Sequence, residues 1–475
     1  MNDTQRKNVY IIGAGLTGLS AAWKLSETGK YNIEIFEAAD CPGGMSATFK
    51  ENCYSLDYGP HKIFTVLDDV FAEVKTLFSN GEMLTIPKKS RIRLEGEFLD
   101  YPVGIKDLFL KIGLFTGFLC GASYLYTQLK SLIIPSPDKS YEDYIKNRFG
   151  SVIYNLVFAS YARKIWAEPD TLDVMVAKRR VVIPNLLEMF KQMILKQKSD
   201  KIISADEFYY PKDGIGFLSD KMLEIILKNG GKIHYNHRLT RVEAENAKLK
   251  KLIFANKNEI VLNEQDILIN TSLLSEFISN ISSVTENTLK SAEKLKFNDL
   301  ILFFIALNKK RVTDDNWLFF PEEKYPFNRL FEQKGFSAYM IPQNETVLCV
   351  ELTCSSTKDK IWNYTDKELK DLVVPHLEEC GLISVSEIKN VFSRRLKNTY
   401  PIYETGYTEN LNSSLAFLDN LNNTFSIGRL GLFNYVGMMD SIDMGFRTSE
   451  FIINEKKHSE WPAFRERFYN YVVID

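Results

Sequence analysis

The sequence has few cysteines and histidines and no CxxC pair. Its six cysteines are scattered from Cys41 to Cys380, and the five histidines do not cluster with them. This scatter predicts free thiols in a reducing compartment and argues against a disulfide framework or a zinc site. The 59 Lys and Arg nearly balance the 61 Asp and Glu, so no nucleic-acid partner is expected. No signal-peptide pattern precedes the first apolar run, and we expect a cytoplasmic protein.

The chain does have the pattern of a nucleotide-binding turn near its start. Residues 8–13, NVYIIG, are typical of a buried strand, and residues 16–29 have helical spacing. A second strand pattern, NIEIFEA, follows, and the three glycines of the turn are Gly13, Gly15 and Gly18. The first would permit a tight turn, the second the approach of a pyrophosphate, and the third close packing of helix on strand.

An acidic residue ends the second strand. The carboxylate of Glu37 can accept hydrogen bonds from both hydroxyls of an unphosphorylated ribose, and it would repel the 2′-phosphate of NADP. The helix N-terminus beside it attracts phosphate through its N–H groups and dipole. The pattern therefore predicts a dinucleotide other than NADP.

The next glycines resemble a flavin-binding sequence. Glu37 is followed by AADCPGGMSATF, which contains the pair Gly43 and Gly44. This resembles the extended fingerprint of the amine-oxidase-like flavoproteins, and the resemblance implies FAD. His61 follows in a glycine–proline turn, where structural and catalytic roles are both open. The candidate cofactor-binding residues of the N-terminal and middle segments are Gly13, Gly15, Leu16, Thr17, Gly18, Glu37, Gly43, Gly44, Met45, His61 and Val242.

Later segments resemble the UDP-galactopyranose mutases. Residues 161–185 look like the mutase segment in which a K-x-W motif precedes an arginine that faces the sugar diphosphate. The resemblance implies that Arg180 binds phosphate and that Lys164 and Trp166 are structural. The stretch DNWLFFPEEKYPFNRL is similar to a second mutase segment, whose diphosphate-binding arginine corresponds to Arg329.

The resemblance continues to the C-terminal part of the chain. The stretch RRLKNTYPIY matches the one that supplies a substrate-facing tyrosine, here Tyr400. In IGRLGLFNYVGMMDSIDMG the resemblance implies that Tyr435 faces the diphosphate and that the residues at the flavin are Gly428, Arg429, Met439 and Asp440. The candidate catalytic residues are therefore His61, Arg180, Arg329, Tyr400 and Tyr435.

Two departures from the mutase pattern concern the substrate. The stretch DYPVG places Val103 and Gly104 where the mutases hold uracil with an aromatic residue and a glutamine, and Phe319 replaces a tyrosine on the phosphate side. The DYPV form is closer to bacterial proteins described as protoporphyrinogen-oxidase-like. We therefore expect an anionic small-molecule substrate, such as a sugar diphosphate, without a reproduced uridine pocket.

The most apolar stretch is residues 107–134. Its uncharged run from Ile112 to Gln128 has Lys111 and Lys130 at its ends and is at the lower limit for crossing a bilayer. Three interpretations stay open: a buried helix pair, a helix that dips into one leaflet or forms a hydrophobic substrate mouth, and a membrane span. The second would give peripheral contact with the inner face of the membrane.

The predicted fold class is α/β, with a Rossmann-like FAD-binding domain, an inserted mixed-sheet substrate domain and a helical domain. The apolar strand 267–272 is expected to rejoin the first sheet, and strands 299–308 and 347–353 to form a second. The expected boundaries are 1–65, 201–275 and 420–455 for the FAD-binding domain, 66–200 for a largely helical lid, 276–419 for the mixed sheet and 456–475 for a tail.

Two enzyme functions stay open. The mutase resemblance implies isomerisation of a nucleotide sugar or related sugar phosphate on reduced FAD, without net redox change, for cell-surface polysaccharide biosynthesis. The flavoprotein resemblance also allows oxidation of a lipophilic or amine substrate, with hydride transfer to FAD. Either function makes the protein an FAD-dependent enzyme.

Overall fold

The chain folds into two units, each assembled from separate stretches of sequence. The computed structural model describes residues 6–101, 103, 111–134, 136–180 and 206–471. The first unit comprises Met1–Leu84, Tyr210–Phe297 and Gly406–Tyr471, and the second comprises Thr85–Tyr209, Asn298–Thr405 and Val472–Asp475. Gly104 and the segment 181–205 lie outside the described residues.

A five-stranded sheet organises the first unit. Its order is β19-β13-β1-β2-β9, all neighbours run parallel, and its strands are Lys7–Ile12 (β1), Tyr31–Phe36 (β2), Lys232–His234 (β9), Ile267–Asn270 (β13) and Thr424–Ser426 (β19). The central strands β1 and β13 are short and mostly apolar, as in a sheet covered on both faces. The predicted return of 267–272 to the first sheet is confirmed, because β13 pairs with β1 from Val9↔Ile267 onward.

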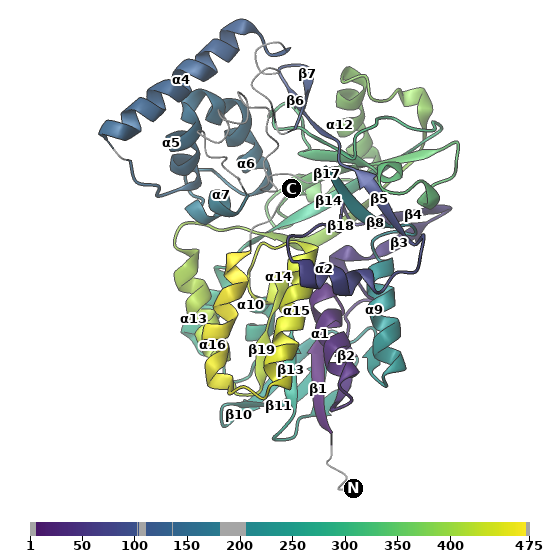
Figure 1. Ribbon diagram of the computed structural model, residues 1–475, viewed down its shortest axis with the longest axis vertical. Helices are drawn as coiled ribbons and strands as arrows, with labels where there is room; N and C mark the ends of the chain where they lie inside the picture. Colours follow the sequence, from purple (N-terminus) through teal and green to yellow (C-terminus); the bar gives the residue numbers. More distant parts are fainter. Residues whose placement is uncertain (1–5, 102, 104–110, 135, 181–205, 472–475) are drawn as a thin grey trace. The chain divides into compact units, whose positions relative to one another are not determined.

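Two helices cross closely in this unit. Helix α1 (Leu16–Glu27) follows β1, and α15 (Met438–Ile453) lies beside it (Figure 1). A methyl group on Gly445 would come within 2.0 Å of Ser20 Oγ, so the crossing depends on this glycine. The other helices of the unit are α2 (Asp68–Lys75), α9 (Phe217–Lys228), α10 (Leu274–Ser279), α11 (Glu286–Glu293), α13 (Tyr407–Asp419), α14 (Gly428–Gly431) and α16 (Trp461–Arg465).

Smaller antiparallel sheets accompany the parallel one. The first is a hairpin of β3 (Thr48–Glu51) and β4 (Tyr54–Asp57). The second has the order β10-β11-β12 and consists of Leu239–Glu245, Lys248–Phe254 and Glu259–Val261. Strands β5 (Met83–Pro87) and β8 (Glu207–Pro211) pair with each other at the points where the chain changes unit.

The second unit is built on a seven-stranded sheet. Its order is β18-β14-β17-β16-β15-β6-β7, and its strands are Ser90–Leu94 (β6), Glu97–Asp100 (β7), Phe297–Leu307 (β14), Trp317–Phe319 (β15), Arg329–Glu332 (β16), Thr346–Cys354 (β17) and Ile388–Pro401 (β18). The predicted strands 299–308 and 347–353 are confirmed and pair antiparallel. The segment 66–200 is less helical than expected, because β6 pairs with β15 and β7 pairs with β6, so that both strands extend this sheet.

Helix α12 (Asp366–Glu379) packs on the apolar side of that sheet. Leu369, Val373 and Leu377 share a fully buried cluster with alternate side chains of β14 and β17. A capping box fixes the start of the helix, since Thr365 Oγ1 accepts the Glu368 N–H and the Glu368 carboxylate accepts the Thr365 N–H.

A group of helices completes the second unit. It consists of α4 (Leu114–Ile133), α5 (Tyr141–Ile153), a π-helical turn (Tyr154–Phe158), α6 (Ala159–Ile165) and α7 (Val174–Arg180). In Figure 1, α4 lies at the margin of this group with α5 against one side. The interpretation of 107–134 as buried is wrong for the described part, since only Gly117 and Cys120 of α4 are buried. Among the described helices, none combines the length and apolarity needed to cross a bilayer.

Candidate cofactor and anion sites

The glycine turn after β1 has the geometry that the sequence predicts. Gly13 has a φ of +100°, its N–H donates to the Phe36 carbonyl at 2.9 Å, and a methyl group on it would come within 2.4 Å of Thr271 Oγ1. A methyl group on Gly18 would come within 2.1 Å of the Gly13 carbonyl oxygen. Both glycines are therefore required by the turn and by the packing of α1 on β1.

Gly15 is different, because the protein itself does not require it. It precedes α1 with an ordinary φ of −73°, and a methyl group on it would meet no atom within 4 Å. The space beside Gly15 is therefore open at the position where helix α1 begins. Such an open helix N-terminus fits the pyrophosphate of a dinucleotide.

The second glycine pair packs onto the first turn. The Gly43 N–H donates to the Ala14 carbonyl at 2.8 Å, and Gly15 and Gly43 form a parallel bridge. Gly43 and Gly44 have φ values of +103° and +56°, a conformation that favours glycine. The two glycine turns are adjacent in space and form one cradle lined by backbone atoms. This arrangement fits FAD, as the sequence predicts.

The carboxylate of Glu37 lies beside this cradle. Its Oε2 accepts the Ala14 N–H at 2.7 Å and its Oε1 accepts the Ala39 N–H at 2.8 Å. An ionised carboxylate has about four acceptor positions, so two remain for ribose hydroxyls. The residue is only partly buried, which keeps those positions accessible.

The C-terminal flavin segment approaches α1. A methyl group on Gly428 would lie 3.0 Å from Thr17 Oγ1, and Gly428 has a φ of +86°. The Arg429 Nη2 donates to the Val436 carbonyl at 2.6 Å, and its guanidinium lies 5.6 Å from the ring centre of Tyr435. The first unit thus brings Gly428 to the helix that begins at the glycine turn, and Arg429 and Tyr435 lie near each other in the same C-terminal segment.

Two further candidates begin α15. Met439 is buried, and Asp440 accepts the Gly437 N–H at 2.8 Å through Oδ2. Burial, with the nearby charge of Asp443, raises the pKa of Asp440 to about 6, against the lowering effects of that hydrogen bond and of Arg429. Asp440 therefore carries a proton more readily than an ordinary aspartate.

The remaining candidates of the first unit lie in ordinary structure. Leu16 and Thr17 are buried in the first turn of α1, and Met45 lies in the short 3₁₀ turn after Gly43. His61 is partly buried, and its N–H donates to the Gly59 carbonyl at 2.9 Å. Val242 is fully buried. Its N–H donates to the Asn280 carbonyl, and its carbonyl accepts the Ser282 N–H. A cofactor contact through the backbone of Val242 would therefore displace one of these hydrogen bonds.

In the second unit, Arg329 forms a buried ion pair that the sequence did not predict. Its Nε and Nη2 donate to Oε2 and Oε1 of Glu351 at 2.9 and 3.0 Å, across neighbouring strands β16 and β17. The Glu351 side chain is 0% exposed and that of Arg329 is 21% exposed. The pair uses one edge of the guanidinium, and Nη1 takes no part in it.

Two tyrosines contribute to the electrostatics of this arginine. Burial alone would lower the pKa of the Arg329 guanidinium, but the charge of Glu351, with Tyr400 on β18 and Tyr161 on α6, raises it above its ordinary value. Arg329 is therefore a fixed positive charge. The structure brings the predicted residues Arg329 and Tyr400 together and adds Tyr161, which lies one helical turn before Lys164 in the mutase-like segment.

Arg180 ends α7 and is partly buried, directly before the stretch that lies outside the described residues. Its neighbour Arg179 is the more deeply buried of the two, and its Nη1 donates to the Tyr403 hydroxyl at 3.0 Å. Sequence reasoning chose Arg180 from the family pattern and did not separate the two arginines by burial. The phosphate-binding role of Arg180 stays a prediction.

Lys164 has contacts that match the structural role implied for it. Its Nζ donates to the Phe320 carbonyl at 2.7 Å, to the Phe327 carbonyl at 3.2 Å and to the Glu322 carbonyl. The amino group of Lys164 thereby fixes the loop between β15 and β16, and burial lowers its pKa to about 7. Because β16 begins with Arg329, Lys164 also positions the candidate anion-binding residue.

The departures from the mutase pattern give Arg329 an aromatic neighbour. Phe319 lies opposite Arg329 in the β15–β16 register. Its ring centre is 4.9 Å from that of Tyr101 and 6.0 Å from that of Tyr161, in the latter case edge to face. The candidate anion site at Arg329 therefore has an aromatic wall made of Phe319, Tyr101 and Tyr161.

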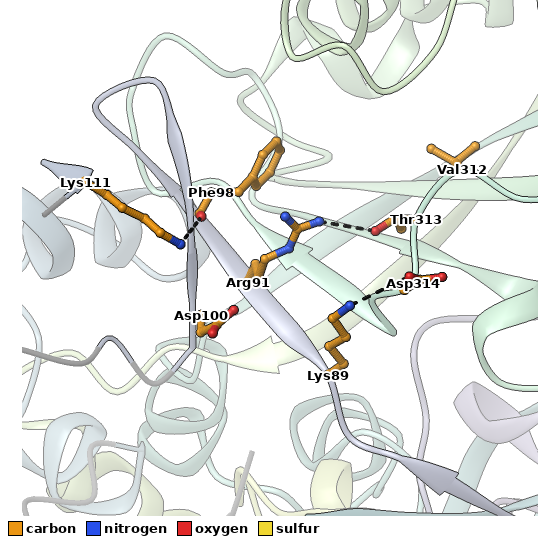
Figure 2. Close-up of a pocket in the computed structure, with 8 residues that line it drawn as sticks. All are labelled: Lys89, Arg91, Phe98, Asp100, Lys111, Val312, Thr313 and Asp314. Carbon is orange, nitrogen blue, oxygen red and sulfur yellow. Dashed lines mark hydrogen bonds and ion pairs between the residues drawn. The ribbon is translucent and has the colours of Figure 1, made fainter. Parts of the chain in front are cut away.

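A separate pocket of about 450 Å³ in the second unit lies between β6, β7 and the loop after β14 (Figure 2). Its lining side chains include three cations, Lys89, Arg91 and Lys111. The first pairs with Asp314 at 3.9 Å, the second donates to the buried Asp315 at 2.9 Å through Nε, and the third donates to the Phe98 carbonyl at 3.3 Å. None of the predicted site residues lines this pocket.

Comparisons with known proteins agree with this architecture. Residues 11–79 match the family described as NAD(P)-binding Rossmann-like domain. The structure resembles a crystal structure of reduced UDP-galactopyranose mutase, with a TM-score of 0.82 and 20% identity over 98% of this chain and 100% of that chain. It also resembles a putative protoporphyrinogen oxidase from Exiguobacterium sp. 255-15, with a TM-score of 0.73 and 16% identity over 95% and 99% of the two chains.

The chain has the fold of the FAD-dependent oxidoreductases. Among curated relatives, a 1-hydroxycarotenoid 3,4-desaturase of Flavobacterium sp. (strain P99-3) is 22% identical over 69% of this chain and 70% of its own length. The comparisons support an FAD-dependent enzyme, and the residues that match the family, 11–79, lie in the first unit. At these identities they show the fold, and the reaction has to be argued from the residues of this chain.

Proposed function

We propose that the protein is a UDP-galactopyranose mutase-like enzyme that acts on a nucleotide sugar or a related sugar phosphate. The observation that carries the proposal is the charged Arg329, fixed by the buried Glu351 and close to Tyr400. Glu351 holds Nε and Nη2 of the guanidinium, and the remaining N–H groups are suited to bind a phosphate oxygen. A mutase product of this kind would supply cell-surface polysaccharide biosynthesis.

The proposal assigns a separate task to each unit. Reduced FAD, when bound, supplies an electron-rich ring to the reaction. The residues that would hold it are those of the two glycine turns, with Glu37 at the ribose and Gly428 beside α1. Arg329 would bind the diphosphate and stabilise the negative charge that it gains as a leaving group, while Tyr400 would donate a hydrogen bond to it. Arg180, of the same unit, is proposed to contact the same diphosphate.

A specific observation favours oxidation of a lipophilic substrate as the second candidate. Phe319, Tyr101 and Tyr161 form an apolar wall beside Arg329, and Phe319 removes a hydroxyl that the mutases carry. Such a wall suits a flat or apolar substrate with one anionic group. The similarity to a carotenoid desaturase is in line with this candidate.

Anaerobic turnover separates the two reactions. The purified holoprotein is reduced with dithionite and incubated with UDP-galactopyranose and other nucleotide sugars, and the products are separated by anion-exchange chromatography. The proposal predicts a ring-contracted nucleotide sugar with reduced protein and none with oxidised protein. Oxygen consumption with an apolar substrate, without any change in the nucleotide sugars, would replace the proposal with the second candidate.

A further inference from the structure

Helix α4 packs against α5 through its small and polar side chains, a face that amphipathic helices usually expose to solvent. Its buried residues are Gly117 and Cys120, and its polar contacts face α5, where Gln128 Nε2 donates to the Arg148 carbonyl at 2.9 Å and Ser123 Oγ accepts the Val152 N–H at 3.3 Å. The large apolar side chains of the helix point away from the unit. A soluble helix normally has the opposite arrangement.

The exposed side chains form one continuous stripe. They recur at helical spacing and comprise Leu114, Phe115, Phe118, Leu119, Leu125, Tyr126, Leu129, Leu132, Ile133 and, just beyond the helix, Ile134. Phe115 is 75% exposed and Phe118 is 66% exposed. Ten such side chains present on the order of 1,000 Å² of apolar surface, above the roughly 300–600 Å² of the largest patch on a typical monomer.

The charge that helix α4 itself carries has one sign. Helix α4 contains no Asp or Glu, and its basic residues are Lys130 within it and Lys111 just before it. Lys111 lies in the pocket that also contains Lys89 and Arg91 among its lining residues, together with the carboxylates of Asp100 and Asp314 (Figure 2). Basic residues beside an apolar helical face match the anionic headgroups and acyl chains of a lipid leaflet.

We propose that α4 is an interfacial helix that binds the protein to the surface of an anionic membrane. The helix would lie in the plane of the leaflet with its apolar stripe in the acyl region and its lysines at the headgroups. Its 20 residues would lie along about 30 Å of surface. This inference goes beyond the proposed reaction and holds for either candidate, because it concerns only where the enzyme works.

A second copy of the chain is a less suitable occupant. Two α4 helices packed through their stripes would bury Lys130 and Lys111 without any carboxylate from the helix to pair with them. Headgroups supply that charge in a membrane. The charge pattern therefore favours lipid over self-association.

Vesicle flotation tests the proposal with the full-length holoprotein. The probes are vesicles of phosphatidylcholine alone and of phosphatidylcholine mixed with phosphatidylglycerol. We expect binding to the mixed vesicles, and we expect Phe115→Gln/Phe118→Gln to lower the partition coefficient by at least about tenfold, since two exposed aromatic side chains no longer enter the leaflet. Lys130→Gln should weaken binding to the mixed vesicles and leave binding to neutral vesicles unchanged.

Matched variants and a measurement of mass decide between the outcomes. Val261→Gln/Tyr339→Gln alters two similarly exposed apolar residues outside α4 and should float like the parent protein. The flavin absorption spectrum shows that each variant is folded. The proposal is overturned if the parent protein does not float, if the α4 variant floats equally well, or if lipid-free protein is a dimer that the α4 variant converts to a monomer.

Discussion

Removal of the Arg329 guanidinium is predicted to destabilise the second unit even when no ligand is bound. Arg329→Ala would leave the Glu351 carboxylate, which is 0% exposed, without the bidentate partner that now holds both of its oxygens. Leaving one charge of a buried pair uncompensated costs about 3–5 kcal/mol of unfolding free energy. The loss should appear as a lower urea midpoint, followed by tryptophan fluorescence of the apoprotein.

The double variant Arg329→Met/Glu351→Leu separates this structural role from ligand binding. Replacing both members of a buried pair with apolar residues of similar size is often neutral, so its stability should lie within about 1 kcal/mol of the parent protein. Its affinity for UDP, measured by calorimetry, should still be at least about tenfold weaker, because the charge is absent. A urea midpoint of Arg329→Ala equal to that of the parent would refute the structural reasoning. Parental UDP affinity in the double variant would refute the binding role.

Two further predictions concern single groups. Lys164→Met should lower the unfolding free energy by about 2–4 kcal/mol, because three carbonyls of the β15–β16 loop lose their donor. The control variant Lys178→Met alters an exposed lysine of α7 and should leave the urea midpoint unchanged. The raised pKa of Asp440, about 6, means that the folded protein binds this proton more tightly than the unfolded chain. The apoprotein should therefore lose on the order of 2 kcal/mol of unfolding free energy as pH rises from about 4 to about 6. Asp440→Asn should remove this pH dependence. An equal pH dependence in the variant would contradict the raised pKa assigned to Asp440.

The cofactor half of the molecule was predictable because its determinants are local. Strand, glycine turn, helix and acid follow one another in the sequence. At Gly13 and Gly18 the structure confirms that a larger side chain would collide with neighbouring atoms. The return of β13 to β1 was also predictable, since a short apolar run suits a covered parallel sheet.

The rest depends on pairings that leave no local trace. Glu351 lies 22 residues after Arg329, on the neighbouring strand. Nothing in the sequence around Glu351 marks it as the partner of Arg329. Strands β6 and β7 join a sheet whose other strands begin only at Phe297, far along the chain, so their segment was expected to be helical. The sequence showed that residues 107–134 are apolar, but only the packing of α4 against α5 shows that most of the large apolar side chains are exposed.

The central claim, that FAD lies across the two glycine turns, is tested most directly at Gly15. A methyl group there meets no protein atom within 4 Å, so Gly15→Ala should change the stability of the apoprotein by less than about 1 kcal/mol. The same methyl group would occupy the approach to the helix N-terminus. FAD affinity, measured by fluorescence titration of the apoprotein, should therefore fall by at least about tenfold.

Gly121→Ala, another glycine with no neighbouring atom within 4 Å, is the matched control and should bind FAD like the parent protein. An unchanged FAD affinity in Gly15→Ala, with the control behaving as expected, would contradict the account.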